Sequence, residues 1–214
     1  MPVSVKICIP IAESLTPHCE RSLHALQEDA CRDRNYVIGV DILRSCYLYS
    51  SRNMLIGESW CIEDAKKAAD LWDYYWFIDS DIGGFDLAML HTMIAARSLA
   101  VSVPYIQRDD PGRFVCGLFH WDCEEIASMF RPNTVELYPE CDWCGLGCGL
   151  FHKSLFTSYL PFPWFSPVTV QHTYKGKEFA EVIGEDLSFC RKLYFAGIKV
   201  KNLALLRHKL EHHR

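Results

Sequence analysis

The chain has 214 residues, half of them hydrophobic, which is enough for one domain with a substantial core. Its 22 basic and 27 acidic residues give a net charge of −5, so the composition provides no broad basic surface for nucleic acid. The sequence contains no signal-peptide pattern and no apolar run of membrane-spanning length. We therefore expect a cytoplasmic protein, or one in the host cytoplasm if the chain is viral.

Alternating strand and helix patterns fill the first half of the chain. Apolar runs bounded by turn residues predict strands at 6–11, 36–43, 74–78 and 100–104. Helical spacing predicts helices that begin at Pro17, at Ser50 or Ser51, and at Phe85, the last with Asp86 as its N-cap. We expect the second of these helices to run on to Trp72 and the third to Leu99. This order predicts a mostly parallel sheet flanked by helices, a Rossmann-like α/β fold.

The stretch 74–84 is the most informative one. Five large apolar residues stop at Asp79-Ser80-Asp81, which Gly83 and Gly84 follow. Residues two apart in an extended segment project to the same side, and open α/β sheets bind ligands at the carboxyl ends of their strands. Asp79 and Asp81 are therefore candidates to hold one hard cation together with phosphate oxygens of a ligand. A solvated loop with two turn-forming aspartates is the alternative.

The second half is less regular. A strand is predicted at 134–138, a glycine-rich loop at 141–149 and a helix at 151–159. The proline-rich stretch 161–167 excludes a regular element, and its aromatics would form either a sugar or base platform or a lid over the core. Gly184-Glu185-Asp186 opens a helix that Gly197 ends, and a last strand is predicted at 198–206.

Several polar residues allow two interpretations. The pair Arg52-Asn53, placed at the start of a helix, would bind a diphosphate or hold a neighbouring loop. Asp41, near the end of a strand, is either a ribose or base contact or a turn carboxylate. Glu185 and Asp186 suit a helix N-terminus on dipole grounds alone, and His208 in a basic segment would by itself be a surface residue.

Eleven cysteines is a high and odd count. Without an export signal we expect reduced, mostly buried thiols. Cys141, Cys144 and Cys148 are spaced as C-x2-C-x3-C, which differs from a standard pair of zinc knuckles. Their role stays open between zinc or iron–sulfur ligation and packing around the glycine-rich loop.

In this order, the motifs resemble those of GT-A fold glycosyltransferases, which use nucleotide-sugar donors. The resemblance rests on Arg52-Asn53, Asp79-Ser80-Asp81, Gly145-Leu146-Gly147, Glu185-Asp186 and His208, and it covers nearly the whole chain. It implies a single GT-A-like domain over residues 1–214, with a nucleotide-sugar-binding half at 1–104 and an acceptor-binding, catalytic half at 105–214.

The resemblance also implies roles for these residues. The donor would be bound by Arg52, Asn53, Asp79, Ser80, Asp81, Gly145 and Gly147. A Mn²⁺ or Mg²⁺ ion would be held by Asp79, Asp81 and His208. The metal would neutralise charge on a nucleoside-diphosphate leaving group, with a UDP-sugar as the first expectation. Asp186 would take the proton of the acceptor hydroxyl and Glu185 would orient the acceptor. The expected activity is that of a hexosyltransferase that inverts the anomeric carbon.

Two other functions stay open. Nucleotidyltransferases that act on sugar phosphates also pair carboxylates with a metal, but they usually carry a glycine-rich basic loop after the first strand, whereas residues 10–14 here have neither glycine nor base. The second alternative is that the chain is a non-catalytic, cysteine-rich metal-binding module. The acceptor is undetermined among glycan, lipid, protein and a hydroxymethylated DNA base. A local basic groove for DNA would use Arg108, Arg113, Lys175, Lys177 and the C-terminal basic residues.

Overall fold

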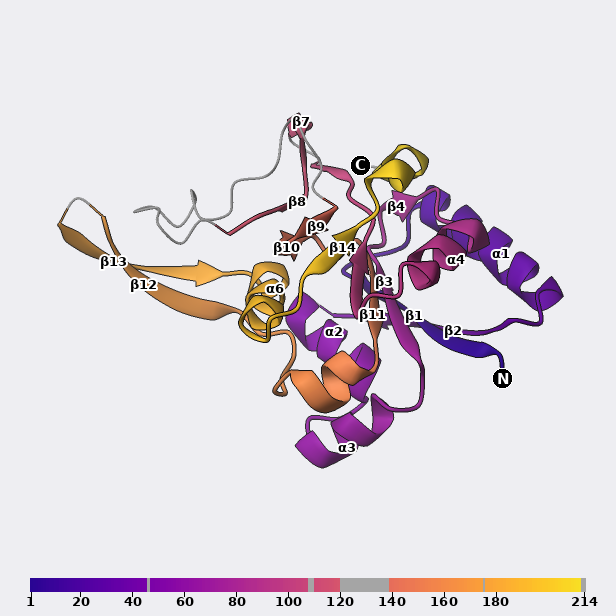
Figure 1. The fold of residues 1–214 in the computed structure, drawn as a ribbon, viewed down its shortest axis with the longest axis horizontal. Coiled ribbons are helices and arrows are strands. Elements are labelled where there is room, and N and C mark those ends of the chain that lie inside the picture. The colour runs from indigo at the N-terminus through magenta and orange to yellow at the C-terminus, as the bar shows by residue number, and fades with distance from the viewer. Residues whose placement is uncertain (46, 108–109, 120–138, 175, 213–214) are drawn as a thin grey trace.

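The computed structural model describes residues 1–45, 47–107, 110–119, 139–174 and 176–212. Its centre is a seven-stranded sheet in the order β2-β1-β3-β11-β5-β14-β9 (Figure 1). These strands are β1 (Val3–Ile11), β2 (Tyr36–Arg44), β3 (Tyr74–Ile78), β5 (Ala100–Ser102), β9 (Glu140–Cys141), β11 (Cys148–His152) and β14 (Val200–Asn202). The strand predicted at 134–138 lies outside the described residues.

The sheet is mostly parallel, as predicted. β2, β1 and β3 pair in parallel, and β5 pairs in parallel with β14. β11 lies antiparallel between β3 and β5, and β9 is antiparallel to β14. The expected α/β fold is thus confirmed, and both halves of the chain contribute strands to one sheet. The predicted helix at 151–159 is wrong in its first part, because Phe151 and His152 end β11; only Leu155–Tyr159 coils, as the π-helix η1.

Helices cover both faces of the sheet (Figure 1). On one face, α1 (Pro17–Arg32) and α4 (Leu87–Ala95) pack against Trp76 and Ile78 of β3. On the other, α2 (Leu48–Gly57), α3 (Ile62–Ala68) and α6 (Glu185–Phe195) surround Tyr75 and Phe77. Alternate side chains of β3 therefore enter opposite cores, which explains why this strand has no polar face.

The ends of the helices show which local sequence signals were sufficient to predict a helix boundary. Asp86 caps α4 as predicted, since its Oδ1 accepts a hydrogen bond from the Met89 amide at 2.6 Å, although the helix ends at Ala95. α6 begins at Glu185, and Gly197 follows its end with φ +72°. The single helix predicted from Ser50 or Ser51 to Trp72 is wrong. α2 begins earlier, at Leu48, and ends where Glu58 adopts φ +53°; α3 is separate.

A hairpin of β12 (Val168–Tyr174) and β13 (Lys177–Ile183) projects from the body of the molecule (Figure 1). The sequence analysis did not predict it. β13 runs directly into Gly184, so the arm ends at the start of α6. The last strand predicted at 198–206 is shorter, because β14 ends at Asn202 and a 3-10 helix, η2 (Ala204–Lys209), follows.

Short strands complete the structure. They are β4 (Ile82–Gly83) with β15 (Glu211–His212), β6 (Ile106–Gln107) with β7 (Asp110–Phe114), and β8 (Cys116–Gly117) with β10 (Trp143–Cys144). The stretch 161–167 is irregular, as predicted, but Trp164 and Phe165 are fully buried and cannot form an exposed platform. In the described part of the chain, no helix combines the length and apolarity needed to cross a bilayer.

Candidate active site

Arg52 is the centre of the candidate site. It lies in the middle of α2, not at a helix N-terminus as expected, and its side chain is only 2% exposed. A buried guanidinium requires charged partners, because removing it from water is costly. The partners come from two distant parts of the sequence, the end of β3 and the start of α6.

Three carboxylates surround this guanidinium. Arg52 Nη2 donates to Asp79 Oδ1 at 2.9 Å, and Nη1 donates to Glu185 Oε1 at 2.9 Å and to Asp186 Oδ1. The first aspartate of the predicted metal motif and both carboxylates of the predicted catalytic motif therefore meet at one cation. We call Arg52, Asp79, Glu185 and Asp186 the Arg52 cluster.

The glycine-rich loop joins the same cluster through its backbone. The Leu146 amide donates to Asp186 Oδ2 at 3.3 Å, and the Asp79 amide donates to the Gly147 carbonyl at 3.0 Å. Both oxygens of Asp186 thus accept hydrogen bonds in this structure. Three of the predicted motifs and the arginine that precedes them converge on one point.

Tyr105 is the residue of this site that the sequence analysis missed. It follows β5, and its hydroxyl accepts a hydrogen bond from the Gly147 amide at 3.2 Å. A Cβ at Gly145 would lie 2.4 Å from the Tyr105 hydroxyl, and one at Gly147 would lie 2.7 Å from it. The two glycines therefore make room for Tyr105. Their predicted contact with a donor stays a prediction. The position of Tyr105, just beyond a parallel strand at the ligand-binding edge, was the available signal.

Electrostatic interactions in the cluster are strong because water is largely excluded. Burial alone would lower the pKa of Arg52, but the charges of Asp186, Asp79 and Glu185 outweigh it and raise that pKa. Burial and the neighbouring charge of Asp186 raise the pKa of Glu185, and Arg52 only partly offsets them. Burial also raises the pKa of Tyr105 well above its usual value, so its hydroxyl stays protonated.

The second half of the Asp79-Ser80-Asp81 motif lies at the rim of the cluster. Ser80 and Asp81 are half-buried in the turn between β3 and β4. The Ser80 carbonyl accepts hydrogen bonds from the Thr16 amide at 2.9 Å and the Thr16 hydroxyl at 3.2 Å, which anchors the turn to α1. β15 pairs with β4, so the segment after η2 lies beside this turn (Figure 1).

The predicted metal ligands are only partly assembled. Asp79 and Asp81 follow the same strand, but His208 lies exposed in η2. Among the described residues, no group of three or more His, Cys, Asp or Glu side chains is arranged to hold a metal ion. Metal binding by Asp79, Asp81 and His208 stays a prediction.

Asn53 and Asp41 have structural partners. The fully buried Asn53 side chain accepts a hydrogen bond from the Phe165 amide at 3.1 Å and donates to the Tyr49 and Phe165 carbonyls, so it holds the neighbouring 161–167 loop. Asp41 Oδ2 lies 2.7 Å from Nζ of the buried Lys6, which also contacts Glu58 at 2.8 Å. We call Lys6, Asp41 and Glu58 the Lys6 cluster.

The described cysteines are free thiols. Seven are buried, as expected for most of the thiols, whereas Cys31 and Cys61 are exposed. Cys141 donates to the Val200 carbonyl and Cys148 packs beside Met89, so the thiols of the C-x2-C-x3-C segment point to different neighbours. Burial raises the pKa of Cys148 to about 12, so this thiol is protonated at neutral pH.

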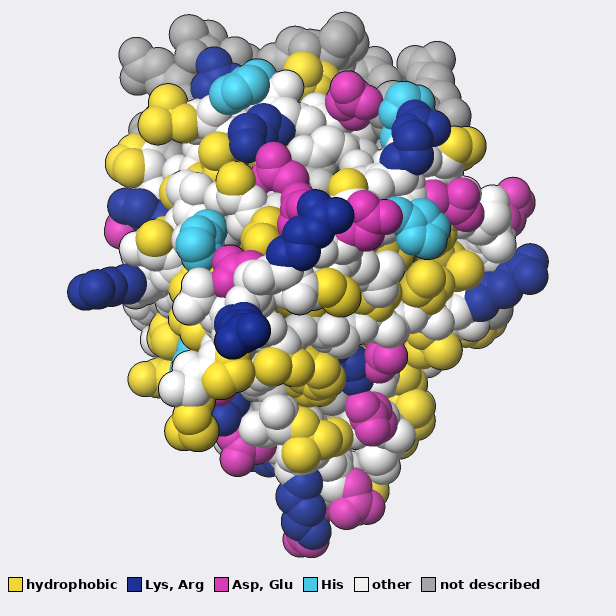
Figure 2. All heavy atoms as spheres, turned by 90° about the vertical axis from the view of Figure 1, so that its right-hand side faces the viewer, with side chains coloured by type: hydrophobic (Ala, Val, Ile, Leu, Met, Phe, Trp, Pro, Cys, Tyr) yellow, Lys and Arg dark blue, Asp and Glu magenta, His cyan; other side chains and the backbone are white. Residues whose placement is uncertain are grey.

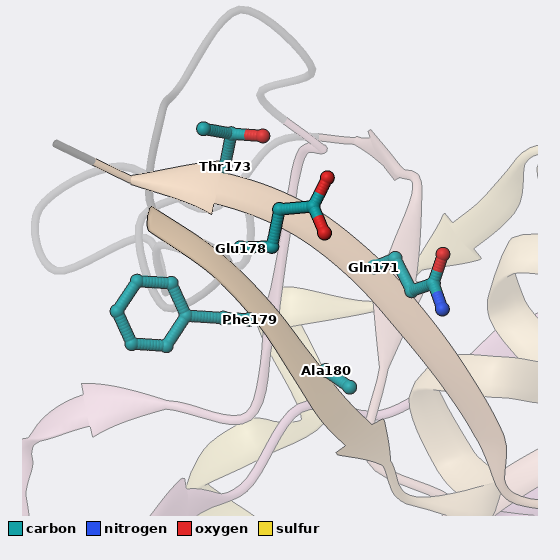
Figure 3. A pocket seen from close by; sticks show the side chains of 5 residues that line it. All are labelled: Gln171, Thr173, Glu178, Phe179 and Ala180. Atoms are coloured by element: carbon teal, nitrogen blue, oxygen red, sulfur yellow. The ribbon is translucent and has the colours of Figure 1, made fainter. Parts of the chain in front are cut away.

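A hollow of about 270 Å³ lies along the β12–β13 arm, away from the Arg52 cluster. Thr173 and Glu178 point to the same side of the two strands there, while the Phe179 ring points away (Figure 3). None of the predicted site residues lines it. Of the residues named for a basic groove, Arg108 and Lys175 lie outside the described part of the chain.

Comparison with solved structures identifies the fold. A197 from STIV superimposes with a TM-score of 0.59 at 16% identity, over 98% of this chain and 83% of that chain. The two chains share one fold. This likeness concerns the fold alone.

Weaker likenesses extend to enzymes. They include a glycosyltransferase involved in the glycosylation of the major capsid of PBCV-1 (TM-score 0.34, 13% identity, 76% of this chain and 70% of that chain). A second is 4-diphosphocytidyl-2C-methyl-D-erythritol synthase from Anaerococcus prevotii (TM-score 0.43, 15% identity, 95% and 89%). At these TM-scores neither bears on the activity of this chain. No family model and no curated protein matches the sequence.

Proposed function

We propose that this protein is a glycosyltransferase that moves a sugar from a nucleoside-diphosphate sugar, in the first instance a UDP-sugar, to an acceptor hydroxyl. The observation that carries the proposal is the convergence of Asp79, Glu185 and Asp186 at Arg52. One guanidinium faces three carboxylates, and Asp81 follows at its rim. Carboxylates gathered at the end of a strand supply the oxygen ligands that a divalent cation prefers, and a diphosphate ligand would share that cation.

The residues at the end of β3 fit a divalent cation in their chemistry. Asp79 and Asp81 supply carboxylate oxygens, the ligands that Mg²⁺ and Mn²⁺ prefer. Arg52 Nη2 donates to Oδ1 of Asp79, so a shared cation would bind beside the guanidinium. When bound, the metal would neutralise charge on the departing diphosphate. His208 would need to approach from η2 to complete the expected set of ligands.

Asp186 is the proposed acceptor of the proton from the attacking hydroxyl, and Glu185 is proposed to orient the acceptor. Both oxygens of Asp186 are engaged, one by Arg52 and one by the Leu146 amide. A movement of the guanidinium toward the phosphates of the donor would free one oxygen of Asp186 for the proton. Arg52 would then couple donor binding to base availability. A base on the face opposite the leaving group supports transfer with inversion.

The acceptor-binding role proposed for residues 105–214 has one structural support. The β12–β13 arm enters α6 directly at Gly184, next to the proposed base. An acceptor held along this arm would be delivered to Asp186. The choice among glycan, lipid, protein and modified DNA rests with experiment.

Product analysis tests the proposal. Purified protein is incubated with Mn²⁺ and a panel of UDP-, GDP- and dTDP-sugars, and nucleoside diphosphate and pyrophosphate are measured separately. Even without an acceptor, slow transfer to water should release nucleoside diphosphate, and Asp186→Asn should abolish this release. Pyrophosphate release, with nucleoside triphosphate and sugar phosphate as substrates, would instead establish the nucleotidyltransferase alternative.

A further inference from the structure

β2 forms an open edge of the main sheet. It is nine residues long and pairs with β1 on one side, and no described strand pairs with its other side. Val37 is 48% exposed and Ile42 is 45% exposed. Figure 2 looks at the side of the molecule on which β2 lies, where hydrophobic side chains gather among charged ones. Long apolar edge strands are templates for pairing with another chain, and natural proteins usually protect them.

The direction of the unpaired backbone groups follows from the ends of the β1–β2 ladder. The Val3 amide donates to the Asn35 carbonyl, and the Ser45 amide donates to the Ile11 carbonyl. Residues 35 and 45 therefore face β1. Because direction alternates along a strand, the odd-numbered residues of β2 face β1 and the even-numbered residues face outward. The outward residues are Tyr36, Ile38, Val40, Ile42 and Arg44.

We propose that the partner of this edge is a second copy of the chain, which pairs antiparallel through β2 about a two-fold axis at Val40. A two-fold axis perpendicular to the sheet pairs the two strands antiparallel and keeps every side chain on the same face of the sheet. One residue of β2 must then lie opposite the same residue of the second copy. If that residue is Val40, all five outward-facing residues form hydrogen-bonded pairs. Ile38 then faces Ile42 of the other copy, and Tyr36 faces its Arg44.

The side chains are self-complementary in this register. The face that α1 covers carries a continuous apolar stripe, from Ile38 through Val40 to Ile42, closed at each end by a tyrosine opposite an arginine. On the other face, Val37 lies opposite Leu43, and Asp41 lies opposite Gly39. No like charges face each other directly, and Asp41 keeps its ion pair with Lys6 at 2.7 Å.

A hollow beside the edge accommodates the arginine of the second copy. It measures about 390 Å³ and is lined by residues that include Tyr36, Ile38 and one residue of each charge, Asp33 and Arg34. In the proposed register, Arg44 of the other copy comes opposite Tyr36, beside this hollow and its aspartate. If the axis lay at Ile38 or Ile42 instead, the apolar pairs at one end of the strand would be lost. Arg44 would then no longer lie opposite Tyr36 of the other copy. The apolar pairs and the hollow opposite Arg44 therefore favour the register centred on Val40.

The first test is the association state of the full chain. Sedimentation velocity over a concentration series should show a monomer–dimer equilibrium. Ile42→Lys places a charge in the apolar stripe and should raise the dimer Kd at least tenfold. Val182→Lys is the matched control: Val182 is a more exposed apolar residue, on the β12–β13 arm, and its substitution should leave the Kd unchanged. A wild-type monomer at 200 µM, or a dimer lost only in Val182→Lys, would overturn the proposal.

The second test concerns the register. Val37 and Leu43 of the two copies form a non-hydrogen-bonded pair, whose Cα atoms lie about 4.5 Å apart, within disulfide range. In a background in which both exposed cysteines of the described part of the chain, Cys31 and Cys61, are replaced by serine, the double variant Val37→Cys with Leu43→Cys should form a covalent dimer on mild oxidation. The single Val37→Cys variant should not. Cross-linking of the single variant, or its absence in a double variant that keeps the wild-type circular dichroism spectrum, would contradict the register centred on Val40.

Discussion

Two buried cations in this fold are paired in different ways. Lys6 in β1 is 4% exposed and contacts Asp41 and Glu58, whose side chains are 52% and 56% exposed. Arg52 in α2 is 2% exposed and contacts three carboxylates, of which the most exposed, Asp186, is only 32% exposed. Water can solvate the carboxylates that contact Lys6. The carboxylates that contact Arg52 depend largely on protein groups to stabilise their charge.

The difference separates a structural ion pair from a candidate site. In the Lys6 cluster, burial would lower the pKa of Lys6, but hydrogen bonds to Asp41 and Glu58 raise it, so the cation is simply retained. In the Arg52 cluster, one guanidinium contacts three carboxylates, and burial together with the charge of Asp186 raises the pKa of Glu185. Carboxyl groups with a perturbed pKa, gathered around one buried cation, are typical of functional sites.

The largest expected effect is on catalysis. Asp186→Asn keeps the shape and hydrogen bonding of the side chain but removes the proton acceptor, so the rate should fall roughly 10²–10⁴-fold. Donor affinity should change little, because the base acts on the acceptor. Glu58→Gln in the Lys6 cluster is the matched control and should retain the wild-type rate. Steady-state kinetics of both variants would show whether only the Arg52 cluster acts in catalysis. An equal loss of rate in the two variants would contradict this difference between the clusters.

The next effect is on stability. Arg52→Met leaves three carboxylates without their counter-ion, and breaking a buried ion pair from one side costs about 3–5 kcal/mol. Urea unfolding at pH 7 measures this change. Arg32→Met is the control, because Arg32 is 76% exposed and its loss should cost under about 0.5 kcal/mol. An Arg52 variant as stable as the control would show that Arg52 does not stabilise the three carboxylates.

A smaller effect is expected in the Lys6 cluster. Lys6→Met keeps the apolar stem and leaves Asp41 and Glu58 where water can reach them. The free energy of unfolding should therefore fall by no more than about 1–2 kcal/mol, since a hydrophobic replacement of a buried ion is often close to neutral. The same urea titration compares it with Arg52→Met. A loss as large as that of Arg52→Met would contradict the comparison.

The smallest effect concerns the pH dependence of stability. The pKa of Glu185 is raised above its ordinary value of 4.5, so the folded state binds its proton more tightly than the unfolded state. The contribution of Glu185 to stability is therefore complete below pH 4.5 and is lost as pH rises through the folded-state pKa. Relative to Glu185→Gln, the wild-type Tm should decline over that interval. A difference in Tm that is constant between pH 4 and 8 would contradict the shift.

The sequence alone predicted the sheet and the convergence of the motifs. The apolar run of β3 and the two aspartates after it placed Asp79 at the ligand-binding edge, and the Gly184-Glu185-Asp186 pattern marked the start of α6. Asp86 and Gly197 identified helix ends, because capping depends on local chemistry.

The missed features depend on contacts distant in sequence. β11 lies between β3 and β5 because its backbone pairs with both, which its composition does not reveal. Arg52 was expected at a helix start, but tertiary packing starts α2 at Leu48. Tyr105 was missed because its hydroxyl matters only once the Gly147 amide is beside it. The β12–β13 arm was missed although Val168, Val170 and Tyr174 alternate with polar residues before Gly176, which is a hairpin signal.

The most direct test of the account is the dependence of nucleotide binding on a divalent cation, measured by calorimetry with UDP in Mn²⁺ or in excess chelator. If the end of β3 holds a cation shared with a diphosphate, Mn²⁺ should raise the UDP affinity of the wild type at least tenfold. Asp81→Asn should lose this gain, and Glu58→Gln should keep it. Tight UDP binding that is the same in chelator, or a gain that survives Asp81→Asn, would contradict the central claim.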